Sequence, residues 1–168
     1  MAIRTTFIVG FPGETDKEFE ELVDFIKEMK FERLGVFEYS REEGTKAHDF
    51  GGQLPSRIKR ERFDTIMKLQ QEISKEINAR YLGKDLEVLI DEPANAALPA
   101  FGRRGGTPPF GGGPHTRKPY NYICRTEHDA PEVDGNCFVK TKKPYRPGEF
   151  ARVRIVDTLE YDLAGEEI

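Results

Sequence analysis

The stretch Thr6–Glu14, TFIVGFPGE, constrains the fold of this chain more than any other feature. An apolar run from Phe7 to Val9 ends at Gly10, and the Pro-Gly pair that follows prevents the strand from continuing. The pattern predicts a buried strand that passes through a tight turn into the N-terminus of a helix. In proteins built from parallel strands, ligands bind at this carboxyl end of the strand. Glycines in the turn allow the backbone to approach such a ligand closely.

The first half of the chain is typical of a strand–helix–strand unit. The pair Thr15-x-x-Glu18 forms a capping box, which marks the start of a helix with one apolar stripe. Because a helix connects the two strands, they are expected to be parallel. The face of a second, longer helix that is rich in Lys, Arg, Glu and Gln is expected to be solvated. The predicted elements are a strand at 3–9, a helix from 16 to about 30, a strand at 34–39, a loop at 40–55 and a helix at about 57–81.

The second half predicts a small β-barrel. Short segments alternate between apolar and charged residues, as in Glu149–Asp157, where every second residue from Ala151 to Ile155 is apolar. Asp-Gly and Pro-Gly pairs mark turns between such segments. Strands are predicted at 85–91, 136–140, 149–157 and 159–163, and a basic loop rich in proline and glycine at 92–120.

Composition limits the partners and the compartment. A chain of 168 residues allows one large domain or two small ones, and a net charge of −4 argues mildly against a broad nucleic-acid surface. No apolar run approaches the roughly 18 residues that cross a bilayer, and no leader is recognised, so no membrane contact and a cytoplasmic location are expected. Cys124 and Cys137 are expected to be free thiols, with a disulfide as the alternative if two strands bring them together.

Several segments, in their order along the chain, support a resemblance to a known family. They are GFPGET, RLGVFEYSREEGT, IMKLQQEIS, GKDLEVLID, DAPEVDG and PGEFARVRIVDTLEYDLAGE. In this order they resemble the C-terminal part of a radical-SAM methylthiotransferase followed by its TRAM domain. The resemblance implies an α/β plus all-β fold. Its expected parts are the C-terminal part of a (β/α)6 radical-SAM partial TIM barrel at 1–55, a last barrel helix and connector at 56–83, and a small OB-like TRAM β-barrel at 84–168.

Three segments, Leu34–Thr45, Asp129–Gly135 and Glu160–Glu166, resemble the RimO branch in particular. That branch methylthiolates the β-carbon of an aspartate in a small-subunit ribosomal protein, so the resemblance implies a basic ribosomal protein as partner. An acidic chain attracts such a protein better than it attracts RNA. Two alternatives stay open. One is the MiaB branch, which modifies an adenosine in tRNA, and the other is a non-catalytic module that binds RNA or the ribosome.

The family uses S-adenosylmethionine (SAM) and two 4Fe–4S clusters, which cysteine thiolates hold. This sequence contains no CxxxCxxC motif, and its two cysteines do not replace three closely spaced ligands. The chain is therefore expected to be a C-terminal fragment that is inactive on its own. No metal ligand and no catalytic residue is assigned to it. Its isolated histidines, His48, His115 and His128, are expected at the surface.

By resemblance, the turn after the first strand and the end of the second strand lie at the SAM end of the barrel. Two simpler interpretations stay open, because helix capping alone explains Glu14, and ordinary core packing explains Phe37. The candidate SAM-binding residues are Gly10, Phe11, Pro12, Gly13, Glu14, Phe37 and Tyr39.

A basic set in the predicted barrel, interleaved with aromatic residues, is the candidate for partner binding. Such a surface grips an RNA backbone and stacks bases, as TRAM domains of the tRNA branch do, with rRNA or tRNA as the ligand. It is equally suited to steering a ribosomal protein. The alternative is that these charges only cover the outside of the barrel. The candidate residues are Lys140, Lys142, Lys143, Tyr145, Arg152 and Arg154.

Overall fold

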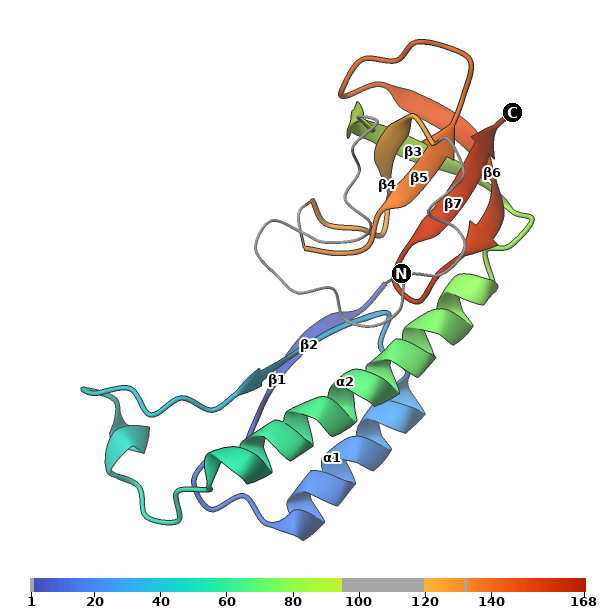
Figure 1. Ribbon diagram of the computed structural model, residues 1–168. Helices are drawn as coiled ribbons and strands as arrows, with labels where there is room; N and C mark the ends of the chain where they lie inside the picture. Colours follow the sequence, from blue (N-terminus) through green and yellow to red (C-terminus); the bar gives the residue numbers. More distant parts are fainter. Residues whose placement is uncertain (1, 95–119, 132) are drawn as a thin grey trace. The chain divides into compact units, whose positions relative to one another are not determined.

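The computed structural model describes residues 2–94, 120–131 and 133–168 (Figure 1). Two compact units divide the chain, unit 1 at 1–77 and unit 2 at 78–168. Most of the proline- and glycine-rich loop predicted at 92–120 lies outside the described residues. No described helix combines the length and the apolarity that crossing a bilayer would need.

Unit 1 begins with the predicted strand–helix–strand arrangement. Strands β1 (Arg4–Val9) and β2 (Arg33–Glu38) are parallel, and helix α1 (Asp16–Met29) connects them. The predicted capping box is confirmed, since Thr15 accepts from the Glu18 amide at 3.2 Å and Glu18 accepts from the Thr15 amide at 2.8 Å. The connection thus starts where the sequence indicates, and it leaves the two strands side by side.

The sheet of unit 1 has one covered and one uncovered face. Helix α1 and the long helix α2 (Ser56–Ala79) lie on one side of the strands (Figure 1), where Val9 and Val36 are buried. Ile8 and Phe37 are paired directly across the strands on the other face, 56% and 63% exposed. This apolar pair has no cover among the described residues. The predicted loop between β2 and α2 also contains a short 3-10 helix, η1 (Lys46–Asp49).

The face of α2 that is rich in charged residues is exposed as expected, for example at Lys68, Glu72 and Lys75. Three polar residues, Arg62, Gln70 and Ser74, are buried on the opposite face, at helical spacing from the buried Ile66. The Gln70 amide nitrogen donates to the Phe31 carbonyl at 2.9 Å and to the Ser74 hydroxyl at 3.0 Å. This side of the helix faces backbone carbonyls at the ends of the other elements, so polar side chains are needed to satisfy them.

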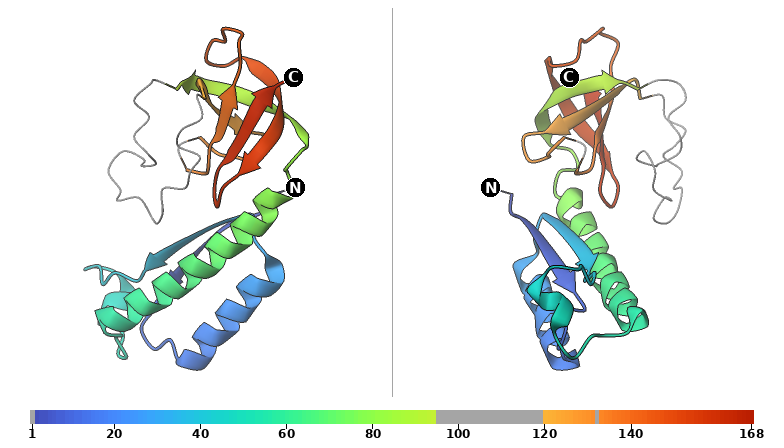
Figure 2. Two further views of the ribbon diagram at one scale, coloured as in Figure 1. Left: turned by 45° about the vertical axis from the view of Figure 1, so that its right-hand side comes forward. Right: turned by 90° about the vertical axis from the view of Figure 1, so that its left-hand side faces the viewer.

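Unit 2 is a closed five-stranded β-barrel (Figure 2). The strands hydrogen bond in the order β3-β4-β5-β7-β6, and β6 closes the barrel by pairing with β3. All pairs are antiparallel except β5–β7, which is parallel. A five-stranded Greek-key barrel of this kind fits the expected OB-like domain. The strands are β3 (Asp85–Pro93), β4 (Tyr122–Thr126), β5 (Cys137–Lys140), β6 (Phe150–Thr158) and β7 (Leu163–Glu167).

The barrel core confirms most of the predicted inward faces. Val88 and Ile90 of β3 and Val153 and Ile155 of β6 are at most 1% exposed. The strand predicted at 159–163 is wrong, because the Leu159 amide donates to the Asp162 carbonyl at 2.8 Å and closes a turn there. Strand β7 begins only at Leu163, and β4, which the alternation did not single out, supplies the fifth strand.

Candidate functional site

The turn after β1 is held by hydrogen bonds of its own. Gly10 adopts φ = +74°, and its amide donates to Oε2 of Glu14 at 2.9 Å. The same oxygen accepts from the Phe11 amide at 3.3 Å. A Cβ on Gly10 would lie 2.5 Å from Cγ of Lys59, so only glycine fits where α2 crosses the turn. Glu14 therefore folds back onto its own turn.

The remaining amides of this turn are also paired. The Gly13 amide donates to the Gly52 carbonyl at 2.9 Å, and the Glu14 amide donates to the Phe11 carbonyl at 3.0 Å. Pro12 has no amide hydrogen to offer. A ligand at this end of the sheet would thus meet side chains and carbonyl oxygens of the turn, because its backbone donors from Gly10 to Glu14 are already used.

A buried arginine forms an ion pair with the Glu14 carboxylate. Arg62 is 5% exposed, and it donates to the Glu14 carboxylate and, at 3.1 Å, to the Glu14 carbonyl. Its other terminal nitrogen donates to Asp16 at 2.7 Å. The ion pair ties α2 to the turn and to the first turn of α1. This gives Glu14 a structural role in addition to any contact with a ligand.

Aromatic side chains meet at the carboxyl end of the two strands. The Tyr39 ring lies edge-on to the Phe11 ring, with 5.2 Å between the ring centres, and the centres of the Phe11 and Phe50 rings are 6.1 Å apart. The ammonium of Lys59 lies 4.9 Å from the Tyr39 ring centre and donates to the Tyr39 carbonyl at 3.0 Å. The Tyr39 hydroxyl is buried and lacks a hydrogen-bond partner among the described residues. The structure thus joins Phe11 with Tyr39, while Phe37 lies on the uncovered sheet face.

The candidate basic residues of unit 2 alternate with acids. Strand pairing places Lys140, Glu166, Arg154 and Asp85 in one exposed row across β5, β7, β6 and β3, which we call the charge row. Lys140 pairs with Glu166 at 3.4 Å, and Arg154 donates to both Asp85 oxygens at 2.7 and 3.0 Å. These hydrogen bonds raise the pKa of Arg154 and lower that of Asp85. The row alternates in sign across the barrel and is not uniformly basic.

Glu167 forms hydrogen bonds with two further residues of the candidate basic set, Lys143 and Tyr145. It accepts from Lys143 at 2.7 Å, and it also binds the hydroxyls of Thr141 and Tyr145. These hydrogen bonds lower the pKa of Glu167 to about 2, and the same contact raises the pKa of Tyr145 to about 12. Lys143 and Tyr145 are therefore engaged within the barrel, and Lys142 and Arg152 remain as candidates with no ion-pair partner in the described part of the chain.

The two cysteines lie opposite each other on β4 and β5. Cys124 and Cys137 are paired in the strand register, both are fully buried, and both are free thiols. Burial raises the pKa of Cys124 to about 12 and raises that of Cys137 as well. Residues 2–94, 120–131 and 133–168 contain no group of three or more His, Cys, Asp or Glu side chains placed to hold a metal ion.

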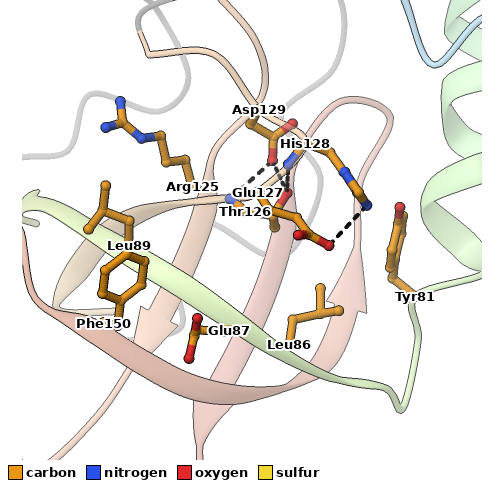
Figure 3. Close-up of a pocket in the computed structure, with 10 residues that line it drawn as sticks. All are labelled: Tyr81, Leu86, Glu87, Leu89, Arg125, Thr126, Glu127, His128, Asp129 and Phe150. Carbon is orange, nitrogen blue, oxygen red and sulfur yellow. Dashed lines mark hydrogen bonds and ion pairs between the residues drawn. The ribbon is translucent and has the colours of Figure 1, made fainter. Parts of the chain in front are cut away.

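A pocket of about 340 Å³ opens on the outer surface of the barrel (Figure 3). Phe150, Leu89 and Arg125 are neighbours across β6, β3 and β4 and form one side. The turn after β4 forms another, where Asp129 accepts from the Thr126 amide at 3.2 Å and hydroxyl at 2.6 Å. The remaining lining residues are Tyr81, Leu86, Glu87, Glu127 and His128.

Most of the pocket was missed at the level of sequence. The sequence predicts a surface position for His128, and it does not single out Phe150 or the other lining residues as a site. The outer face of β3 carries a usable signal, because Leu89 interrupts a face of acidic residues at 85, 87 and 91. Leu89 pairs with Phe150 across the strands, and neighbouring exposed apolar residues of this kind can mark an interaction surface.

Known proteins resemble the chain along its whole length. Residues 115–168 match the sequence profile of the TRAM domain. Proteins named ribosomal protein uS12 methylthiotransferase RimO are similar in Pelotomaculum thermopropionicum (45% identity over 100% of this chain), Desulforamulus reducens (42% over 99%) and Clostridioides difficile (42% over 98%). The chain spans about a third of their length: 33%, 33% and 32%. The resemblance expected from the sequence is confirmed.

Proposed function

We propose that this chain is part of a radical-SAM methylthiotransferase that modifies the β-carbon of an aspartate in ribosomal protein uS12. The observation that carries the proposal is 42–45% identity, over nearly all of the chain, to proteins named for that activity. Because the substrate is a ribosomal protein, we place the reaction in the cytoplasm. Units 1 and 2 are assigned different tasks, cofactor contact and substrate binding.

In this proposal, unit 1 is the C-terminal part of the radical-SAM barrel. The uncovered face with Ile8 and Phe37 would point into that barrel, since helices cover only the other face. SAM would supply the radical that activates the substrate carbon. Phe37, Phe11 and Tyr39 would offer apolar and aromatic surface to it, whereas Gly10, Pro12, Gly13 and Glu14 would shape the turn beside it.

The iron–sulfur clusters do not fit this chain. Both cysteines are used in the barrel core of unit 2, where burial raises the pKa of each thiol and opposes the thiolate that iron requires. We assign the cluster ligands to other residues of a longer protein. No step of electron transfer is assigned to the residues described here, and we expect the chain alone to be inactive.

Unit 2 is proposed to bind the substrate protein. RNA binding depends on cations that neutralise phosphates, and four of the six candidate residues already contact acids within the barrel. A surface on which positive and negative charges alternate suits a protein partner better, because complementary charges on that partner fix its orientation on the barrel. The TRAM match and the unpaired Lys142 and Arg152 favour tRNA or rRNA as the second candidate partner.

A chimera tests the proposal. The chain replaces the matching third of the C. difficile relative, and the chimera is expressed in a strain that lacks its own uS12 methylthiotransferase. Mass spectrometry of uS12 is expected to show the methylthio group on one aspartate. Methylthioadenosine in tRNA with unmodified uS12 would instead support the tRNA branch. A folded chimera that binds its clusters and modifies neither substrate would contradict the enzymatic proposal.

A further inference from the structure

We infer that the pocket on the outer surface of unit 2 takes a cationic side chain, arginine or lysine, of the protein substrate. The inference rests on the proposed function and adds to it a place of contact. It depends on three properties of the pocket, namely its apolar walls, two carboxylates with no Lys or Arg partner among the described residues, and the engagement of Arg125 by an acid outside the pocket lining.

The walls fit the aliphatic stem of a long basic side chain. Leu86 and Leu89 of β3 line the pocket, and the rings of Tyr81 and Phe150 lie toward its two ends (Figure 3). Phe150 is 64% exposed, so its ring is accessible to a ligand. Arginine and lysine bury their methylene stems against such surface, and their cations bind aromatic faces.

Two carboxylates approach the pocket from different elements. Glu87 comes from β3, and Glu127 comes from the turn after β4 (Figure 3). Among the described residues, Glu87 forms no ion pair, and the ion pair of Glu127 is with His128, at 3.6 Å. A guanidinium or ammonium group between them would gain charge-assisted hydrogen bonds.

The other charged groups of the pocket are already satisfied. Arg125 pairs with Asp91 at 3.5 Å, outside the pocket lining, and Asp129 is engaged by Thr126. Arg152 lies opposite Glu87 in the strand register, but it is not a lining residue and forms no ion pair with Glu87. Within the pocket lining, the charge left for a ligand is that of Glu87 and Glu127. A phosphate would be repelled by these two carboxylates, so the pocket favours a basic peptide over RNA.

Peptide binding to the full chain provides the test. A fluorescent hexapeptide with two arginines, the same peptide with lysines, and the same peptide with citrulline are titrated, and anisotropy is read. Citrulline keeps the shape of arginine and removes its charge. We expect the arginine and lysine peptides to bind, and citrulline to weaken binding at least about tenfold. Equal affinity for citrulline and arginine would overturn the inference, whatever the variants below do.

Variants locate the contact. The double variant Glu87→Gln/Glu127→Gln is expected to weaken binding of the arginine peptide at least about tenfold. The matched control Glu20→Gln/Glu92→Gln removes the same charge away from the pocket and is expected to leave affinity within about twofold at 0.15 M salt. Equal losses in both variants would show attraction by net charge alone and would contradict a pocket.

Two further outcomes separate this inference from the proposed function. In the first outcome, an oligouridine binds, Arg125→Gln weakens its binding, and the peptides do not bind. The surface would then be an RNA-binding surface, and the inference would be wrong. If the chimera modifies uS12 while its Glu87→Gln/Glu127→Gln variant has unchanged KM for uS12, the proposed function stands and the pocket inference fails. A raised KM with unchanged kcat supports both.

Discussion

Arg62 shows how one buried side chain can decide the stability of unit 1. It is held by Glu14 and Asp16, and its guanidinium also lies over the Phe19 ring at 5.1 Å. Removing one partner of a buried ion pair leaves the other charge without compensation. We expect Arg62→Met to destabilise unit 1 by about 3 kcal/mol. Urea unfolding followed by helical circular dichroism measures this loss, because α1 and α2 supply most of that signal.

An exposed arginine on the same helix provides the control. Arg57 pairs with Glu61 one turn away at the surface, and such pairs contribute little. Arg57→Met is expected to change the free energy of unfolding by less than about 0.5 kcal/mol. A comparable loss in both variants would show that the buried pair has no special weight.

Glu167 makes the stability of unit 2 depend on pH. Its pKa is lowered from 4.5 to about 2 by hydrogen bonds from Lys143, Thr141 and Tyr145. A lowered native pKa stabilises the folded state above the unfolded pKa, and this stabilisation is lost as the pH falls from about 4.5 toward about 2. Glu167→Gln is therefore expected to destabilise the barrel at pH 7 but to differ little from the wild type near pH 2.

The measurement is the urea midpoint of the tyrosine signal in near-ultraviolet circular dichroism, taken from pH 7 to pH 2. Glu92→Gln, an exposed carboxylate with no ion pair among the described residues, is the control and is expected to follow the wild type throughout. A difference between wild type and Glu167→Gln that is constant with pH would show that Glu167 acts by packing and not by charge.

At the scale of elements, the sequence predicts what local patterns determine. Helix α1 was predictable because its cap uses residues three apart, and β6 was predictable because its inward positions alternate without interruption. The strand expected at 159–163 was wrong because Leu159 and Leu163 look alike in sequence, and only pairing with β5 and β6 shows that the strand starts at the second. The hydrogen bond from buried Gln70 to the Phe31 carbonyl gave no local signal, since Phe31 lies outside α2.

The turn at Gly135 links two elements that are distant in sequence. A Cβ at Gly135 would lie 1.7 Å from the Tyr161 carbonyl oxygen, next to the start of β7. The adjacent Asn136 amide donates to Asp162 at 2.7 Å, and the Asn136 carbonyl accepts from Leu163 at 2.9 Å. The two segments that most resemble the RimO branch in unit 2 therefore meet here, and glycine allows their contact.

Gly135→Ala is expected to destabilise unit 2 by about 2 kcal/mol, because backbone must move to admit the methyl group. Near-ultraviolet circular dichroism in urea measures the change. Gly148→Asn is the control, since Gly148 has φ = +92° but open space around its Cβ, and asparagine tolerates positive φ better than most residues. A larger loss for Gly148→Asn than for Gly135→Ala would show that the close approach at Gly135 relaxes at little cost.

At the scale of the whole molecule, the candidate sites were predicted unevenly. The turn that the glycine–proline pattern marked does join Phe11 to Tyr39, because strand and turn chemistry are local. The basic set was foreseen as residues but not as a row, because the acids that alternate with it come from β3 and β7. Charge compensation of this kind depends on strand order, which the sequence of one chain does not display.

The two units are expected to differ in protection from hydrogen exchange. Unit 2 is a closed barrel, so each of its strands pairs on both sides. Among the described residues of unit 1, β1 and β2 pair only with each other, and their sheet exposes Ile8 and Phe37. Two-stranded sheets are marginal without further strands or cover, and backbone groups near an open edge exchange through local opening.

We expect the amides of β3 and β6 to exchange at least about tenfold more slowly than those of β1 and β2. Hydrogen exchange followed by mass spectrometry on the full chain measures this difference. As a reference for global opening of unit 1, the exchange rates of the α1 amides are compared between the wild type and Arg62→Met. Equal protection of both sheets would contradict the expectation, and it would mean that the packing of α1 and α2 on one face stabilises β1 and β2 as strongly as closure stabilises a barrel.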